Sequence, residues 1–144
     1  MTERARLPES ASPLVLVVED EAPNRALLRA VLSRSTDEWL RGATVLEAAD
    51  LAEARRHLRT QPVDLVLLDV RLPDGSGLDL AEELRDGVLG NKPRVVILSA
   101  SVLPMERDAA LRSGVDAFLG KPYRPADLVE TLRTVLDSDR PGAA

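Results

Sequence analysis

The stretch that decides the fold is LVLLDVRLPDGSG, residues 65–77. Apolar side chains lead directly into the carboxylate of Asp69, and a proline, a second aspartate and two glycines follow it. A short apolar run bounded by turn-forming residues is typical of a strand buried on both faces. The stretch therefore predicts a buried strand that ends on an acid.

The same pattern recurs along the chain, where short apolar runs alternate with amphipathic helical segments. Strands are predicted at residues 14–18, 43–48, 65–69, 94–99 and 117–120, and helices at residues 23–34, 50–60, 76–85, 104–114 and 125–136. The first helix should bury Leu27, Leu28, Val31 and Leu32, and the third Leu78, Ala81 and Leu84.

Five strand-then-helix units with apolar strands indicate an α/β protein whose parallel sheet is covered by helices on both faces. Right-handed crossovers and a partly polar second strand favour a doubly wound, flavodoxin-like order 2-1-3-4-5 over a Rossmann order. We expect one domain over residues 13–137, with a flexible leader at residues 1–12 and a flexible tail at residues 138–144.

Composition limits the class of protein. A net charge of -5 offers no electrostatic attraction for nucleic acid or an anionic membrane surface. The chain has no cysteine and a single histidine, which excludes a disulfide framework, a thiolate metal site and a histidine cluster. No apolar run approaches the roughly 20 residues that span a bilayer, and the leader lacks the apolar core of a signal peptide, so we expect a cytoplasmic protein.

Parallel sheets bind ligands outside the carboxyl ends of their strands, at the point where the strand order reverses. Glu19 and Asp20 follow the first strand and Asp69 ends the third, so the three carboxylates should meet in one crevice. Such a cluster needs a cation, and hard oxygen ligands suit Mg²⁺. Ser99 and Lys121 should reach the same rim and complete a phosphoryl-transfer site.

Four strand-end motifs resemble the receiver domains of two-component response regulators. They are VVEDE, LLDVRLPDGSGLDL, ILSAS and FLGKPY, and the resemblance runs from Leu14 to about Leu136. It implies that Asp69 accepts a phosphoryl group from a histidine kinase or a histidine phosphotransfer protein. The domain would not be an enzyme beyond self-phosphorylation and autodephosphorylation.

The resemblance also assigns roles to single residues. Glu19 and Asp20, with Asp69 and the backbone carbonyl of Arg71, would hold Mg²⁺, for which Mn²⁺ can substitute. Lys121 would contact the phosphoryl group, and its bond to Pro122 would be cis. A Glu-Asp acidic pair replaces the usual Asp-Asp, which points to a water-mediated metal contact for Glu19.

Signalling is implied in the same way. Ser99 would be the switch hydroxyl and Phe118 the switch aromatic, while Arg71 and Ser101 would modulate the lifetime of the acyl phosphate. The fourth helix, last strand and fifth helix would form a surface that binds a downstream protein target, and phosphorylation can also drive dimer formation. Because only DSDRPGAA follows Leu136, the chain reads as a stand-alone regulator or as a receiver cut from a larger protein.

Each residue also has a plainer interpretation. Glu19 and Asp20 could cap a helix, Asp69 could form a turn, Ser99 could be a loop hydroxyl, Lys121 a surface lysine and Phe118 ordinary core. His57 is interpreted as a solvated bystander, and Trp39 as partial core or loop packing remote from the site.

The sequence also bears on three alternative functions. A dehalogenase-type phosphatase also uses a strand-end aspartate with Mg²⁺, but it needs a second acid where this chain has Arg71. A flavodoxin-like electron carrier needs a phosphate loop after the first strand, where EDEAPN is acidic. A receiver fold that binds proteins without phosphorylation is the remaining alternative.

Overall fold

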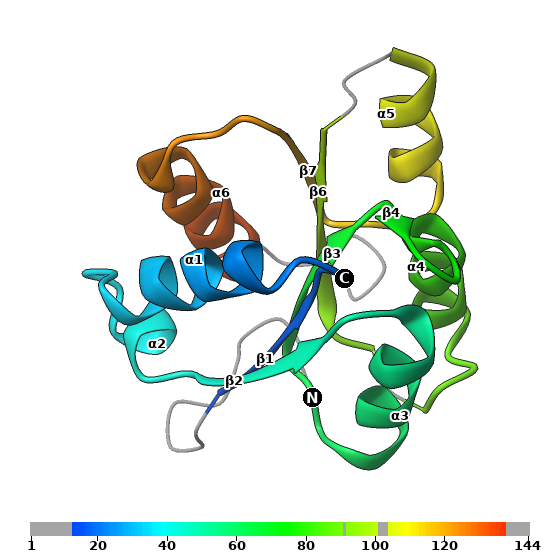
Figure 1. Cartoon of the computed structure of the whole chain (residues 1–144), viewed down its shortest axis with the longest axis horizontal. Helices are drawn as coiled ribbons and strands as arrows, with labels where there is room; N and C mark the ends of the chain where they lie inside the picture. The colour runs from blue at the N-terminus through cyan, green and yellow to red at the C-terminus, as the bar shows by residue number, and fades with distance from the viewer. Residues whose placement is uncertain (1–12, 91, 101–103, 138–144) are drawn as a thin grey trace.

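The computed structural model describes residues 13–90, 92–100 and 104–137 of the chain (Figure 1). The predicted leader at residues 1–12, the predicted tail at residues 138–144 and Ser101 lie outside the described residues. Among the described residues, no helix is long and apolar enough to cross a bilayer.

One parallel sheet forms the centre of the molecule. Its strands are β1 (Leu14–Val18), β2 (Thr44–Ala48), β3 (Leu65–Asp69), β6 (Arg94–Ser99) and β7 (Ala117–Gly120). They lie in the order β2-β1-β3-β6-β7, and each neighbouring pair is parallel. This is the predicted flavodoxin-like order, so the predicted fold class is confirmed.

Helices cover both faces of the sheet (Figure 1). On one face lie α1 (Ala22–Ser33), the short α2 (Glu38–Arg41) and α6 (Pro125–Asp137), and on the other α3 (Leu51–Thr60), α4 (Gly77–Asp86) and α5 (Pro104–Arg112). Every crossover between parallel strands passes through a helix, as a doubly wound sheet requires.

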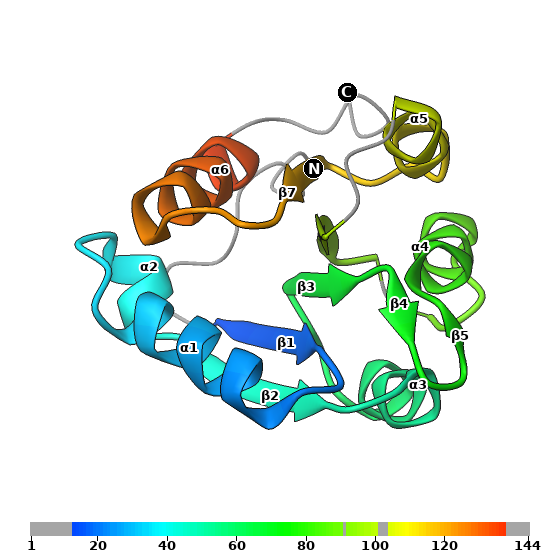
Figure 2. The same cartoon turned by 45° about the horizontal axis from the view of Figure 1, so that its top comes forward.

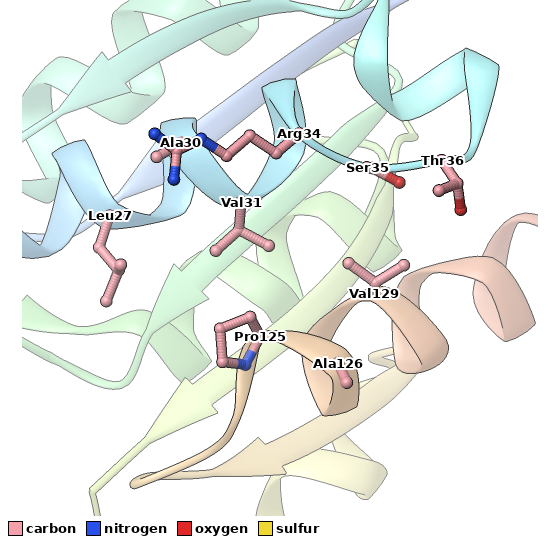
Figure 3. A pocket seen from close by; sticks show the side chains of 9 residues that line it. All are labelled: Leu27, Ala30, Val31, Arg34, Ser35, Thr36, Pro125, Ala126 and Val129. Atoms are coloured by element: carbon pink, nitrogen blue, oxygen red, sulfur yellow. The ribbon is translucent and has the colours of Figure 1, made fainter.

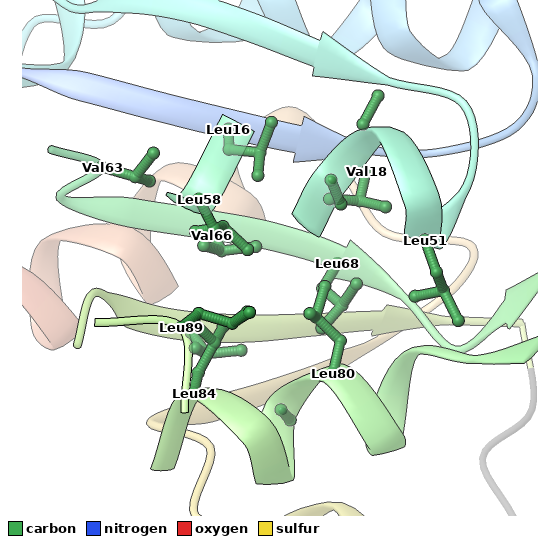
Figure 4. Close-up of a cluster of buried hydrophobic side chains, with 14 of the residues drawn as sticks. Leu16, Val18, Leu51, Leu58, Val63, Val66, Leu68, Leu80, Leu84 and Leu89 are labelled. Carbon is green, nitrogen blue, oxygen red and sulfur yellow. The ribbon is translucent and has the colours of Figure 1, made fainter. Parts of the chain in front are cut away.

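Alternate strand residues supply two separate cores, because successive side chains of a strand point to opposite faces. Leu16, Val18, Val66 and Leu68 pack with α3 and α4 in the core shown in Figure 4. Val15, Val17, Leu65 and Leu67 pack against α1 and α6 on the other face. All eight are at most 1% exposed, and each such burial contributes about 1.5–3 kcal/mol. This buried sheet is the rigid base from which the polar strand ends project.

The structure corrects two expected helix faces. Leu27 is 55% exposed, whereas Leu28 and Leu32, one turn apart, form the buried stripe of α1. On α4, Leu80 is buried with Ala81 and Leu84, while Leu78 is only partly buried. The buried face of α1 is therefore narrower than the apolar pattern predicted, and that of α4 is rotated toward Leu80.

Three short elements were not predicted. They are α2, which Asp37 caps by accepting a hydrogen bond from the Leu40 N–H at 3.1 Å, and the antiparallel pair β4 (Arg71–Leu72) and β5 (Gly75–Ser76). Figure 2 shows this pair beside α3 and α4. Runs of two to four residues carry too little periodicity to be recognised.

Asp74, at the tip of the β4–β5 turn, ties the loop after β3 to α3. Its carboxylate accepts the N–H of Leu51 at 2.8 Å and of Ala52 at 3.1 Å, while Asp50 accepts the N–H of Glu53 at 2.8 Å. Two acids therefore cap one helix, and the hydrogen bonds hold the pKa of Asp74 below its usual value. The second aspartate of the opening stretch is thus a structural residue.

Gly77 allows α4 to begin against the end of β3. A Cβ at this position would overlap the carbonyl oxygen of Asp69 and lie 3.1 Å from the Leu68 side chain. The Gly77 N–H also donates to the Val70 carbonyl at 2.7 Å. A side chain here would displace the backbone that carries Asp69.

We therefore expect Gly77→Ala to lower the free energy of unfolding by about 1–3 kcal/mol, the usual cost of overpacking a close contact. Urea denaturation followed by circular dichroism measures this. Gly42→Ala is the control, because a Cβ at Gly42 would come no nearer than 3.3 Å to the Glu38 carbonyl oxygen. Equal stabilities of the two variants would contradict the packing argument.

Candidate functional site

The acidic residues at the ends of β1 and β3 come together because those strands are neighbours in register. Val18 pairs with Leu68, so the residues that follow, Glu19 and Asp69, emerge side by side at the carboxyl edge of the sheet. Carboxylate oxygens of Glu19, Asp20 and Asp69 all lie within 4.8 Å of one another. The predicted meeting of three carboxylates in one place is confirmed.

Lys121, which follows β7, joins two of these carboxylates. Its Nζ lies 3.1 Å from Oε1 of Glu19 and 3.3 Å from Oδ2 of Asp69. The second oxygen of each acid accepts a backbone N–H, from Glu21 at 3.1 Å and from Arg71 at 3.2 Å. Both acids are thus held in place by a cation on one side and a backbone donor on the other.

The environment acts differently on the two carboxylates. Burial is the strongest influence on Asp69 and raises its pKa, although the Arg71 N–H and Lys121 oppose this. Burial also disfavours the charged form of Glu19, but its hydrogen bonds from the Glu21 N–H and Lys121 together outweigh it and lower the pKa of Glu19. Burial likewise opposes charge on Lys121, yet its two acidic partners raise its pKa. The backbone N–H donors and Lys121 therefore both favour the ionised form of these acids.

The three acids fit a small divalent cation. They differ in exposure, since Glu19 is 3% exposed, Asp69 is half-buried and Asp20 lies at the surface. All three offer hard oxygen donors at a solvent-facing edge, which is the ligand set that Mg²⁺ prefers. Lys121 balances only part of their negative charge, so a divalent cation would be attracted to the remainder.

Ser99 and Lys121 are linked through the backbone. Ser99 ends β6 and is 2% exposed, and its carbonyl accepts the Lys121 N–H at 2.6 Å where β7 ends. Phe118, on β7, pairs with Ile97 and packs against the core on the α3, α4 and α5 face. The plainer interpretation of Phe118 as core thus describes this state, and its switching role stays a prediction.

Of three further sequence predictions, the structure confirms two and corrects one. The Lys121–Pro122 bond is cis, as the resemblance implied. Trp39 packs against the core on the α1 and α6 face, which confirms partial core packing. His57 is half-buried with Nε2 3.2 Å from the Glu47 carbonyl oxygen, so the predicted exposure of this side chain to solvent was wrong. Single-sequence patterns cannot show that the α3 face carrying His57 meets the end of β2.

Arg25 makes an unpredicted contact with the acidic end of β1. Its Nη1 donates to the backbone carbonyl of Glu19 at 2.7 Å, and its Nε donates to Glu47 at 2.9 Å. Tyr123, close to Lys121 in sequence, was also missed; burial raises its pKa, and the charges of Lys121, Glu19 and Asp69 act on it as well. The charged residue Glu47 within β2 was the available sequence signal for the Arg25 contact.

An apolar groove lies between α1 and α6, separate from the acidic cluster (Figure 3). Its volume is about 370 Å³, and it is lined by Leu27, Ala30, Val31, Arg34, Ser35, Thr36, Pro125, Ala126 and Val129. None of the predicted site residues lines it. The exposed Leu27 that the sequence placed in the core forms one wall instead.

Comparison with known proteins identifies the class. The response regulator receiver domain family matches residues 15–133. The chain is 35% identical over 122 residues to the phosphate regulon transcriptional regulatory protein PhoB of Klebsiella pneumoniae, covering 85% of this chain and 51% of that protein. It is 30% identical over 122 residues to the polar-differentiation response regulator DivK of Brucella ovis, covering 85% of this chain and 94% of that protein.

A solved structure agrees with these sequence matches. It is the crystal structure of a response regulator protein from Burkholderia pseudomallei with a phosphorylated aspartic acid, calcium ion and citrate. It matches with a TM-score of 0.72 and 25% identity, over 85% of this chain and 68% of that one. The chain therefore belongs to the response regulator receiver domain family. It spans about half the length of the PhoB protein that it matches.

The contacts of Lys121 lead to a prediction about titration. Lys121→Met removes the cation that lowers the pKa of Asp69 and of Glu19, so both pKa values should rise. Carboxyl ¹³C NMR titration in Mg²⁺-free buffer measures them. Arg124→Met is the control, because Arg124 is an exposed cation that pairs with Asp127. An unchanged Asp69 pKa in Lys121→Met would contradict the assigned geometry.

Proposed function

We propose that Asp69 accepts a phosphoryl group in a Mg²⁺-dependent reaction and that the domain is a phosphorylation switch. The observation that carries this proposal is the position of Lys121, which spans Glu19 and Asp69 beside Asp20. A cation held by a buried acid and a half-buried one stabilises charge that develops at the strand edge. The phosphorylated aspartic acid named for the Burkholderia pseudomallei relative supports the same chemistry.

The chemistry is a displacement at phosphorus. An Oδ atom of Asp69 attacks the phosphoryl group of a phosphohistidine, an Oδ–P bond forms, and the P–N bond breaks. The imidazole leaves with the electron pair of that bond. Lys121 favours the ionised Asp69 that the attack requires and can donate to the transferred phosphoryl oxygens.

The metal would be held by this chain's own oxygens. Asp20, Asp69 and the backbone carbonyl of Arg71 are the proposed ligands, with Glu19 acting directly or through water. Glu19 is only 3% exposed, whereas Asp20 lies at the surface and Asp69 is half-buried, and this burial favours the water-mediated role for Glu19. When bound, Mg²⁺, or Mn²⁺ in its place, supplies positive charge to the phosphoryl oxygens.

Switching would start from the added charge. A phosphoryl group on Asp69 brings new acceptor oxygens within reach of Lys121 and of the Ser99 hydroxyl. Movement of Ser99 would leave space for Phe118, and the surface formed by α5, β7 and α6 would change. That surface carries the exposed apolar side chains of Met105 and Leu111, at 74% and 52% exposure, which suits a downstream protein partner.

Partners and setting follow as parts of the proposal. The phosphodonor would be a histidine kinase or histidine phosphotransfer protein, and the domain would turn over no separate substrate. The cytoplasmic location, the modulating roles of Arg71 and Ser101, and dimer formation on phosphorylation stay predictions. A phosphate-independent binding module is the main rival, but it would not need the contact of Lys121 with both acids.

Intact mass spectrometry tests the proposal. Wild type and Asp69→Asn are incubated with acetyl phosphate, each with and without Mg²⁺. We expect one added phosphate on the wild type, only with Mg²⁺, and none on Asp69→Asn, because the amide lacks the nucleophilic oxygen anion. No phosphate on folded wild type would favour the phosphate-independent module, and a phosphate on Asp69→Asn would move the acceptor elsewhere.

A further inference from the structure

Arg25 connects the first helix to the acidic end of β1. It lies in the first turn of α1, and its guanidinium donates to the backbone carbonyl of Glu19 at 2.7 Å. The side chain of Arg25 is only 17% exposed. A largely buried guanidinium on a backbone carbonyl is a strong, charge-assisted hydrogen bond.

Glu47 fixes the guanidinium in that position. Glu47 pairs in register with Val17 and therefore projects from β2 toward the face that α1 covers. Its carboxylate accepts from Arg25 Nε at 2.9 Å through one oxygen and from Arg29 Nη2 at 2.6 Å through the other. These hydrogen bonds, led by that from Arg29, hold the pKa of Glu47 below its usual value, so the anchor stays charged at neutral pH.

The Glu19 backbone is held from two sides as a result. Its N–H donates to the Ala48 carbonyl of β2 at 3.0 Å, and its carbonyl accepts from Arg25. The chain leaves the sheet at this residue, and the carboxylates of Glu19 and Asp20 follow directly. The peptide that joins these two acids contains the Glu19 carbonyl, so Arg25 contacts it directly, whereas the β2 hydrogen bond is made by the peptide that precedes Glu19.

We propose that Arg25, anchored by Glu47, is a positioning residue for the divalent cation site formed by Glu19, Asp20 and Asp69. This inference rests on the proposed metal-dependent function. It assigns to Arg25 an indirect role, exerted through the backbone carbonyl of Glu19 and not through a carboxylate of the metal site. Contacts of this kind orient the groups that bind a metal and affect its affinity.

A positioning role and a purely electrostatic role for Arg25 predict opposite effects of its removal on Mg²⁺ affinity. As a cation close to the acids, Arg25 repels Mg²⁺, so its removal on electrostatic grounds alone would tighten metal binding. As a positioning residue, its removal would weaken binding. Arg29 provides the matched control, because it pairs with the same Glu47 and carries the same charge, but its other contact is the Val45 carbonyl.

The experiment compares Mg²⁺ affinity in wild type, Arg25→Met and Arg29→Met. Dissociation constants are obtained from backbone amide NMR shifts, so the readout does not depend on phosphorylation. We expect Arg25→Met to bind Mg²⁺ about tenfold more weakly than Arg29→Met, at the low end of such effects. The phosphorylation rate of Arg25→Met from acetyl phosphate should recover at saturating Mg²⁺, since the loss is one of metal binding.

The outcomes separate this inference from the proposed function. Equal affinities in the two variants, tighter binding in Arg25→Met, or a rate that stays low at saturating Mg²⁺ would overturn the positioning role alone. Absence of Mg²⁺ binding by the wild type would overturn the proposed function and this inference with it. If Arg25→Met does not fold, Arg25→Lys and Arg29→Lys replace the pair, and the same difference in affinity is required.

Discussion

The ammonium of Lys121, placed between Glu19 and Asp69, is the interaction on which the carboxyl edge of the sheet depends. Two carboxylates so close together in a partly buried setting would repel each other by several kcal/mol, on the order of 4 kcal/mol at a separation of about 4 Å. Lys121 offsets that repulsion with two ion pairs and favours the ionised form of Asp69. Strand order, loop conformation and the backbone of β7 all act to bring this one cation to this point.

The sheet explains how residues so distant in sequence meet with this accuracy. Parallel neighbours in register bring the ends of β1 and β3 together, and the Ser99 carbonyl positions Lys121 through its N–H. Because the strands are buried on both faces, a shift of register would expose apolar side chains and is strongly disfavoured. The rigid core therefore fixes the positions of the polar residues at the strand ends.

Much of this arrangement could be predicted from the sequence, for identifiable reasons. Apolar runs bounded by turn residues mark buried strands, and a carboxylate at the end of such a run stands out, which is how Asp69 and Glu19 were found. Lys121 was found because it follows the last strand and so reaches the same edge of the sheet. The contacts of Arg25 and Asp74 could not be predicted, since each reaches another segment through a side chain whose direction depends on the finished fold. The burial of Leu27 and of His57 was predicted wrongly, because the polarity of a side chain does not show whether another segment of the fold packs over it.

The central claim is that the strand-end carboxylate of Asp69, and not its acidic neighbours, forms the covalent bond to phosphorus. Borohydride reduction tests this directly, because it converts an aspartyl phosphate to homoserine. Phosphorylated wild type is reduced, digested and mapped by tandem mass spectrometry. The account predicts homoserine at residue 69 alone, and a reduced side chain at Glu19 or Asp20, with Asp69 intact, would contradict it.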